Sequence, residues 1–170
     1  MNNKVIGIFG KRGTGKTLLL KTLIPTMQVP VLIVDETGTF KLKGIKYYNR
    51  KDDIIYKYTV FTEETRERAL NYLQQVRRGT LIIDDGDYLL TLKDVERSII
   101  YSRNYGYSVY YVAKRIVGVS KRVVNNTDDF YFFRVVEQKE IKKIYDSLGV
   151  YLLDLLNLKE KHYIKYRTFT

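Results

Sequence analysis

The sequence contains no cysteine and a single histidine, His162. Without thiols the chain can form neither disulfides nor thiolate metal sites, and one imidazole without a second strong ligand disfavours a zinc site. We therefore interpret His162 as a surface or packing residue. A reducing compartment is compatible with this composition.

Long hydrophobic runs are also missing. No apolar segment approaches the roughly 20 residues that cross a bilayer, and the short apolar run after Lys4 is too brief for a signal peptide. We expect a cytoplasmic protein without a membrane span. Hydrophobic residues nevertheless make up 45% of the chain, with 16 Tyr and 7 Phe, as in a folded protein. No linker divides the 170 residues, so we expect one domain over residues 1–170.

Acidic residues are few relative to basic ones. Thirty Lys and Arg against nineteen Asp and Glu give a formal charge of +11, and the pI is near 9.6. The basic residues are spread over many segments, among them Lys41, Lys43, Lys46, Arg77, Arg78, Lys114, Arg115, Lys121, Arg122, Lys142 and Lys143. This balance favours a polyanionic partner, above all nucleic acid, with solubility as the alternative explanation.

Residues 10–17, GKRGTGKT, fit the phosphate-binding pattern GxxxxGK[ST], or Walker A motif. An apolar run over 4–9 predicts a buried strand before the loop, and 18–24 predicts a helix after it. The glycines allow a tight turn in which backbone N–H groups and a helix N-terminus converge on a polyphosphate. The residues expected to bind the nucleotide are Gly10, Lys11, Arg12, Gly13, Thr14, Gly15, Lys16, Thr17 and Leu18.

Two of these side chains have further expected roles. Lys16 is a candidate catalytic residue that contacts the β and γ phosphates, and the Thr17 hydroxyl is a candidate ligand of Mg²⁺.

Residues 80–85, TLIIDD, predict an apolar strand that ends in two carboxylates, which is the Walker B pattern. We expect this strand to lie beside the strand of the loop, so that Asp84 holds the water shell of Mg²⁺. Asp85 is expected to orient or deprotonate the attacking water. Asp87 is close in sequence, and either acid could instead belong to the turn before the next helix.

The remaining pattern alternates strands and helices. Predicted strands cover 31–34, 58–61, 107–113, 130–136 and an edge strand over 163–169; predicted helices cover 62–78, 93–105 and 137–148. Segments 38–57 and 151–158 are too irregular to assign, and 114–127 is predicted to be a basic loop. Asp35 ends a strand either as an acid at the ligand edge or as a turn cap. The alternation implies a doubly wound α/β sheet.

In this order the features resemble the HerA/FtsK superfamily of P-loop DNA-pumping ATPases, over about residues 4–135. Besides the Walker motifs, the matching stretches are VDETGTF, SRNYGYSVYYVAKR and VVNNTDDFYFFRV. The family usually has glutamine where this chain has Lys114, and Asp-Glu where it has Asp84-Asp85. Without further domains, the chain is similar to genome-packaging ATPases of viruses with internal membranes and to morphogenesis ATPases of filamentous phages.

The resemblance implies an ASCE/RecA-like P-loop NTPase fold, a mostly parallel sheet flanked by helices. It implies an ATP hydrolase that uses ATP and Mg²⁺ to move double-stranded DNA without sequence preference, as in viral genome packaging. The subunits would form a homo-oligomeric, hexameric ring, with a capsid or assembly protein as a further partner. A viral protein of this kind would be found in the host cytoplasm or with the virion.

The resemblance also suggests roles for basic residues. Lys114 stands at the family's γ-phosphate sensor, and Arg103 stands where an arginine finger could reach a neighbouring subunit, with Arg97 and Arg115 as alternates. The charge of +11, independently of the resemblance, makes Lys114, Lys121 and Arg122 candidate channel contacts. Other functions that the sequence leaves open are a plasmid, conjugation or filamentous-phage motor, a small-molecule or nucleotide kinase, and a nucleotide-dependent assembly protein.

Overall fold

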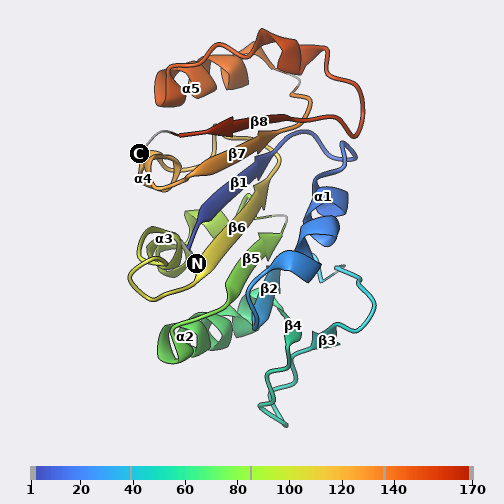
Figure 1. Cartoon of the computed structure of the whole chain (residues 1–170), viewed down its shortest axis with the longest axis vertical. Coiled ribbons are helices and arrows are strands. Elements are labelled where there is room, and N and C mark those ends of the chain that lie inside the picture. The colour runs from blue at the N-terminus through green and yellow to red at the C-terminus, as the bar shows by residue number, and fades with distance from the viewer. Residues whose placement is uncertain (1–2, 39, 85, 136, 169–170) are drawn as a thin grey trace.

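In a computed structural model that describes residues 3–38, 40–84, 86–135 and 137–168, the described residues form one eight-stranded sheet (Figure 1). Its strands are β1 (Val5–Phe9), β2 (Val31–Asp35), β3 (Lys46–Tyr47), β4 (Tyr58–Phe61), β5 (Thr80–Asp84), β6 (Ser108–Ala113), β7 (Asp129–Phe132) and β8 (Ile164–Arg167). Their order is β3-β4-β2-β5-β6-β1-β7-β8, and only β8, at the edge, is antiparallel to its neighbour. The predicted mostly parallel α/β sheet and its edge strand are confirmed.

Helices cover both faces of the sheet, and the central strands are therefore buried on both sides. The α-helices are α1 (Lys16–Leu23), α2 (Arg66–Val76), α3 (Lys93–Ile100), α4 (Lys121–Asn125) and α5 (Gln138–Leu148). Short 3₁₀ turns cover Ile24–Thr26, Glu63–Thr65, Leu89–Thr91 and Leu153–Leu156. Apolar residues of α2 to α5 pack with Phe9 and Val34 in one core, whereas Leu20 of α1 packs with Ile8 and Ile33 in the other. Strands β1, β2 and β5 are apolar over most of their length and buried throughout, as expected for parallel strands covered on both faces.

The expectation that the Walker B strand lies beside the loop strand is wrong. Strand β6 stands between β5 and β1, and it pairs in parallel with both. All three strands are short apolar runs, so their composition carries no information about which of them are neighbours. Asp84 therefore meets the loop across the end of β6.

Several element boundaries differ from the predicted ones for local reasons. Helix α3 ends at Ile100 and not near residue 105, because 101–106 fold into turns that finish at Gly106, whose φ is +77°. The predicted helix over 62–78 begins as a 3₁₀ turn and ends at Arg77, whose left-handed φ is 51°. Helix α4 lies inside the predicted loop over 114–127, and the Ser120 side chain caps it by accepting a hydrogen bond from the Val123 N–H.

The C-terminal helix matches its prediction, since α5 ends at Gly149 with a left-handed φ of 69°. The strand predicted over 130–136 is shorter, because β7 ends at Phe132. Within the described ranges, each helix is too short or too polar to span a bilayer.

Candidate nucleotide-binding site

The glycine loop leaves β1 at the carboxyl edge of the sheet and enters α1, as the motif predicts. Gly10 adopts a φ of +146°, and an added Cβ would lie 2.6 Å from the Cβ of Phe133, so the first turn has no room for a side chain. At Gly13, with a φ of +82°, an added Cβ would meet no atom within 4 Å. The loop is therefore packed at its base and open at its crest, where a phosphate would approach.

Later segments of the chain hold this loop in place. The Lys11 N–H donates a hydrogen bond to the Arg134 carbonyl at 3.0 Å, and the Lys161 N–H donates to the Thr14 carbonyl at 3.0 Å. Residues beyond β7 and before β8 thus brace the loop from both ends. Nothing in the loop sequence itself indicates these partners.

Lys16 is the first residue of α1 and is only 9% exposed. Its ammonium donates hydrogen bonds to the carbonyls of Gly10, at 2.6 Å, and Lys11, at 2.9 Å. The charge is therefore held against the loop that the sequence predicts to bind phosphates. Leu18, two residues further along α1, is exposed.

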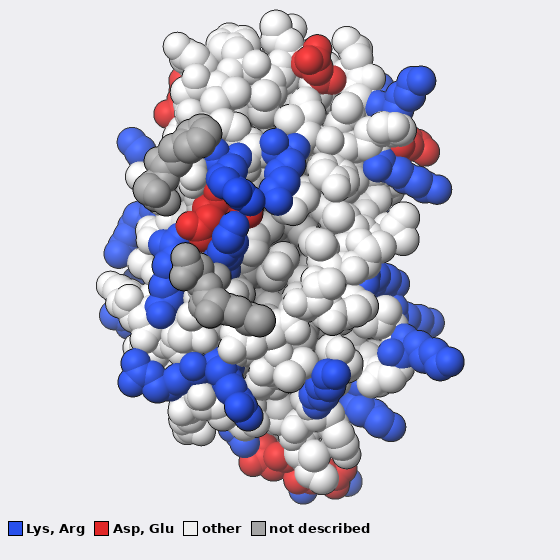
Figure 2. Space-filling model, viewed as in Figure 1, with Lys and Arg blue, Asp and Glu red and all other residues white. Residues whose placement is uncertain are grey.

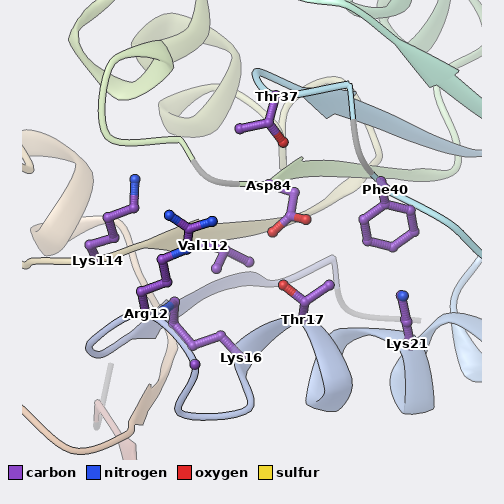
Figure 3. A pocket seen from close by; sticks show the side chains of 10 residues that line it. Arg12, Lys16, Thr17, Lys21, Thr37, Phe40, Asp84, Val112 and Lys114 are labelled. Atoms are coloured by element: carbon purple, nitrogen blue, oxygen red, sulfur yellow. The ribbon is translucent and has the colours of Figure 1, made fainter.

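Thr17 and Asp84 face each other across a cavity of about 260 Å³, while Arg12 extends over it from the loop (Figure 3). The cavity is lined by Arg12, Gly13, Lys16, Thr17, Lys21, Thr37, Phe40, Asp84, Val112 and Lys114. Val112 belongs to β6 and forms the surface between the two Walker segments. Asp84 is 7% exposed at the end of β5. The structure brings together these residues from the loop, β5 and the tip of β6.

Lys114 follows the last residue of β6 and is tied to Asp87. The Lys114 N–H donates to the Asp87 carboxylate at 2.9 Å, and the Lys114 ammonium lies 3.7 Å from the other carboxylate oxygen. Asp87 is therefore a turn acid that positions Lys114, the candidate γ-phosphate sensor. Asp85 lies outside the described residues, so its role as the catalytic acid stays a prediction.

Asp35 is both an acid at the ligand edge and the acid that organises the following turn. Its carboxylate accepts hydrogen bonds from the N–H and hydroxyl of Thr37 and from the N–H of Phe40. Asp35 is also the register partner of Asp84 on the neighbouring strand. This turn places Phe40 in the cavity wall, with the Lys21 ammonium 5.4 Å from the ring centre. Sequence reasoning missed Phe40 and Lys21 as site residues; the stretch VDETGTF was a signal for Phe40, and Lys21 follows the loop on α1.

Arg103 lies away from this cavity, at the opposite edge of the sheet, where β6 and β7 begin. Its guanidinium donates hydrogen bonds to the Asn126 carbonyl at 3.1 Å and to the Asp128 carboxylate at 2.5 Å. Lys121 and Arg122 are exposed on α4, whose chain leads back to that edge. The structure therefore does not bring Arg103 to the nucleotide cavity of its own subunit.

The described residues of this site include few of the side chains that usually bind metals, namely His, Cys, Asp and Glu. Among the residues that the structure describes, no group of three or more His, Cys, Asp or Glu could hold a metal ion. Thr17 and Asp84 supply oxygen donors only. This donor set suits Mg²⁺, which keeps several waters and takes one or two protein ligands together with substrate phosphates.

The parallel sheet, the glycine loop after β1 and the acid at the end of β5 define the fold of a P-loop NTPase. Among solved structures, the chain is similar to the genome-packaging NTPase B204 of Sulfolobus turreted icosahedral virus 2 in complex with ATP-gammaS. The TM-score is 0.81 and the identity 18%, over 98% of this chain and 93% of that one. The DNA-packaging ATPase B204 of Sulfolobus turreted icosahedral virus gives a TM-score of 0.78, 18% identity and coverages of 98% and 94%.

A second kind of similar structure is the cytoplasmic domain of the type VII secretion ATPase EccC from Thermomonospora curvata. The TM-score is 0.66 and the identity 13%, over 98% of this chain and 24% of that one. No protein-family model and no curated protein matches the sequence. The P-loop NTPase fold that the resemblance implies is thus confirmed.

Proposed function

We propose that this protein is an ATP-driven DNA translocase of the genome-packaging kind, in which residues 1–170 act as one domain within a homo-oligomeric ring. The observation that carries the proposal is the cavity in which the Walker A residues Lys16 and Thr17 meet Asp84. The structural likeness to the packaging NTPase B204 and the formal charge of +11 support DNA as the moved polymer.

The residues of the cavity suit a nucleoside triphosphate with Mg²⁺. The open crest at Gly13 leaves backbone N–H groups accessible to phosphate oxygens. The Lys16 ammonium now donates hydrogen bonds to the Gly10 and Lys11 carbonyls. When a nucleotide binds, the ammonium would donate to the β and γ phosphates instead. Thr17 and Asp84 would hold Mg²⁺ directly and through water. When bound, that ion neutralises charge on the phosphate oxygens.

The cleavage step needs a water molecule aligned with the γ phosphate and a base close to it. We assign the base to Asp85, one residue beyond the metal acid, because Asp87 already holds Lys114. Lys114 and Arg12 line the same cavity as Lys16, and we assign them to stabilise charge that develops on the γ phosphate.

A protein-moving motor is the second candidate, and the similarity to the secretion ATPase EccC favours it. The two candidates differ in the polymer that should accelerate hydrolysis. A polyanion should do so for a DNA motor, whereas an unfolded or signal-bearing polypeptide should do so for a secretion motor. A kinase would transfer phosphate to a small acceptor and respond to neither.

The deciding experiment measures phosphate release by the purified protein with and without duplex DNA. We expect stimulation by DNA of unrelated sequences, together with DNA affinity that falls steeply as salt rises, because counterion release dominates such binding. Stimulation by polypeptide alone would support the secretion motor. Hydrolysis that no polymer changes, or DNA affinity that is flat between low and physiological salt, would contradict the proposal.

A further inference from the structure

The connection between β2 and β4 forms a basic projection beside the sheet, which we call the β2–β4 arm (residues 40–57). It extends beyond the body of the sheet and contains the short edge strand β3 (Figure 1). Its basic side chains are Lys41, Lys43, Lys46, Arg50, Lys51 and Lys57, against the acids Asp52 and Asp53. All six basic residues are exposed. Figure 2 shows Lys and Arg side chains projecting along the side of the molecule on which the arm lies in Figure 1.

The two acids of the arm are engaged within the protein. Asp53 forms an ion pair with Arg68 of α2 at 2.7 Å and accepts a hydrogen bond from the Tyr48 hydroxyl at 2.7 Å. The hydrogen bonds from Arg68 and Tyr48 hold the pKa of Asp53 below its ordinary value. Asp52 accepts a hydrogen bond from the Asn49 amide. The acids thus fix the shape of the arm rather than neutralise its lysines.

The lysines near β3 have no comparable partners. Among the described residues, Lys43, Lys46 and Lys51 form no ion pair with an acidic side chain. The rest of the arm is anchored, since Tyr48 stacks on Phe61 of β4 with ring centres 4.8 Å apart. Solvated ammonium groups on an anchored scaffold suit a polyanion whose charges repeat regularly, and a nucleic-acid backbone has that chemistry.

The arm is also joined to the nucleotide cavity. The Tyr47 hydroxyl, on β3, donates a hydrogen bond of 2.6 Å to the Phe40 carbonyl. The Phe40 N–H donates in turn to the buried Asp35 carboxylate at 2.6 Å, and the Phe40 ring lines the cavity. A displacement of β3 would therefore be passed to the cavity wall through one residue.

We propose that the β2–β4 arm contacts the phosphate backbone of duplex DNA and transmits that contact to the nucleotide cavity through Tyr47 and Phe40. The inference rests on the proposed DNA translocase function and names a surface that serves it. The flexible lysine ammonium groups contact phosphates without reading bases, which agrees with binding that is independent of sequence.

The first test compares two double variants with equal loss of charge. Lys43→Gln/Lys46→Gln alters the arm, and Lys142→Gln/Lys143→Gln alters α5. For the arm variant we expect the slope of log affinity for duplex DNA against log salt to decrease by about two, and the affinity at moderate salt to fall about tenfold or more. The α5 variant should keep the wild-type slope. Equal effects of both variants would overturn the inference, because only net charge would then matter.

The second test separates contact from transmission. Tyr47→Phe keeps every charge but removes the hydroxyl that binds the Phe40 carbonyl. We expect wild-type affinity for duplex DNA, an unchanged rate of ATP hydrolysis without DNA, and a severalfold smaller stimulation by DNA. Full stimulation in Tyr47→Phe would overturn the transmission step.

Two further outcomes distinguish this inference from the proposed function. If DNA stimulates the wild type and the arm double variant equally, the arm inference fails and the translocase proposal stands. If DNA does not stimulate the wild type at all, the translocase proposal itself fails. Loss of the oligomer in the arm variant alone, measured by light scattering, would identify the arm as a contact between copies of the chain and overturn DNA as its partner.

Discussion

Lys16 is a charged residue in an enclosed position, and the loop carbonyls that surround it are poor substitutes for phosphate oxygens. We predict that Lys16→Ala weakens binding of ATP by about 10- to 100-fold, since hydrogen bonds to a charged group contribute about 1.5 to 3 kcal/mol. Isothermal titration with ATP measures the effect. Lys16→Arg should not restore affinity, because the planar guanidinium cannot occupy the compact ammonium position. Unchanged affinity in Lys16→Ala would remove the basis of the nucleotide site.

The acids after β5 have different expected roles. Asp85→Asn should keep the binding of ATP and Mg²⁺ while slowing hydrolysis by a factor on the order of 10² or more, because the base for the attacking water is lost. Asp87→Asn should act more weakly, through the position of Lys114, to which Asp87 is bonded. Single-turnover hydrolysis separates the two variants. If Asp87→Asn produces the large effect and Asp85→Asn does not, the assignment of the base is reversed.

At the scale of single residues, the sequence indicates those side chains whose type and spacing phosphate chemistry dictates. The glycines of the loop, Lys16, Thr17 and Asp84 belong to this group, and the structure gathers Gly13, Lys16, Thr17 and Asp84 around one cavity. Phe40 reaches the same cavity only because Asp35 folds the intervening turn. No local pattern requires an aromatic residue there, so sequence reasoning had no reason to select it.

The same distinction holds for the elements. Strand β1 before the Walker A loop and strand β5 of the Walker B segment are recognisable from their apolar runs, and α5 from its periodicity and Gly149. Helix α4 has only five residues and is stabilised by Ser120 and by burial of Val123 and Val124, so its sequence resembles a loop. The order of strands depends on contacts far apart in the chain, which explains why β6 between β5 and β1 was not foreseen.

Asp129 joins three strands at the edge of the sheet opposite the nucleotide cavity. Its carboxylate, in β7, lies 3.0 Å from the Lys4 ammonium, just before β1, and 2.8 Å from the Arg167 guanidinium of β8. Figure 2 shows acidic atoms among basic side chains on this part of the surface. Burial alone would raise the pKa of Asp129, but the hydrogen bonds from Arg167 and Lys4 outweigh it, and the pKa lies below its ordinary value.

This depressed pKa predicts how stability depends on pH. The contribution of Asp129 is present above the unfolded pKa of about 4 and is lost as pH falls through the lower folded pKa. Asp129→Asn should therefore lower the free energy of unfolding at pH 7 by about 1 to 3 kcal/mol, and the difference from wild type should shrink as the pH falls below about 4. Urea denaturation at several pH values measures both. Asp94→Asn, which alters the more exposed pair with Arg66, should cost at most about 1 kcal/mol; an equal cost in both variants would contradict the special role of Asp129.

At the scale of the whole molecule, charged side chains gather at both edges of the sheet where strands begin or end. The carboxyl edge carries the nucleotide cavity and the start of the β2–β4 arm, whereas the amino edge carries Asp128, Asp129 and Arg103. Arg103 cannot serve the cavity of its own subunit from that position. A role in hydrolysis would therefore require the amino edge of one subunit to face the carboxyl edge of the next, which makes the arginine finger a test of the proposed ring.

We predict that Arg103→Ala binds ATP as the wild type does but hydrolyses it about 10³-fold more slowly, because a finger supplies roughly 10³ to 10⁵ in rate. Mixing Arg103→Ala with Lys16→Ala subunits should restore part of the activity, since a Lys16→Ala subunit keeps its own Arg103 and can present it to an intact neighbouring site. The matched control is Asp128→Asn, which alters the partner of Arg103 but leaves the guanidinium. The partly exposed Arg103–Asp128 pair contributes at most about 1 kcal/mol to stability. The amide oxygen of asparagine can still accept the hydrogen bond that the Val5 N–H donates to Asp128, so neither variant should unfold. Full activity of Arg103→Ala alone would exclude it as the finger, and an equal loss in Asp128→Asn without rescue on mixing would show that the pair acts within its own subunit.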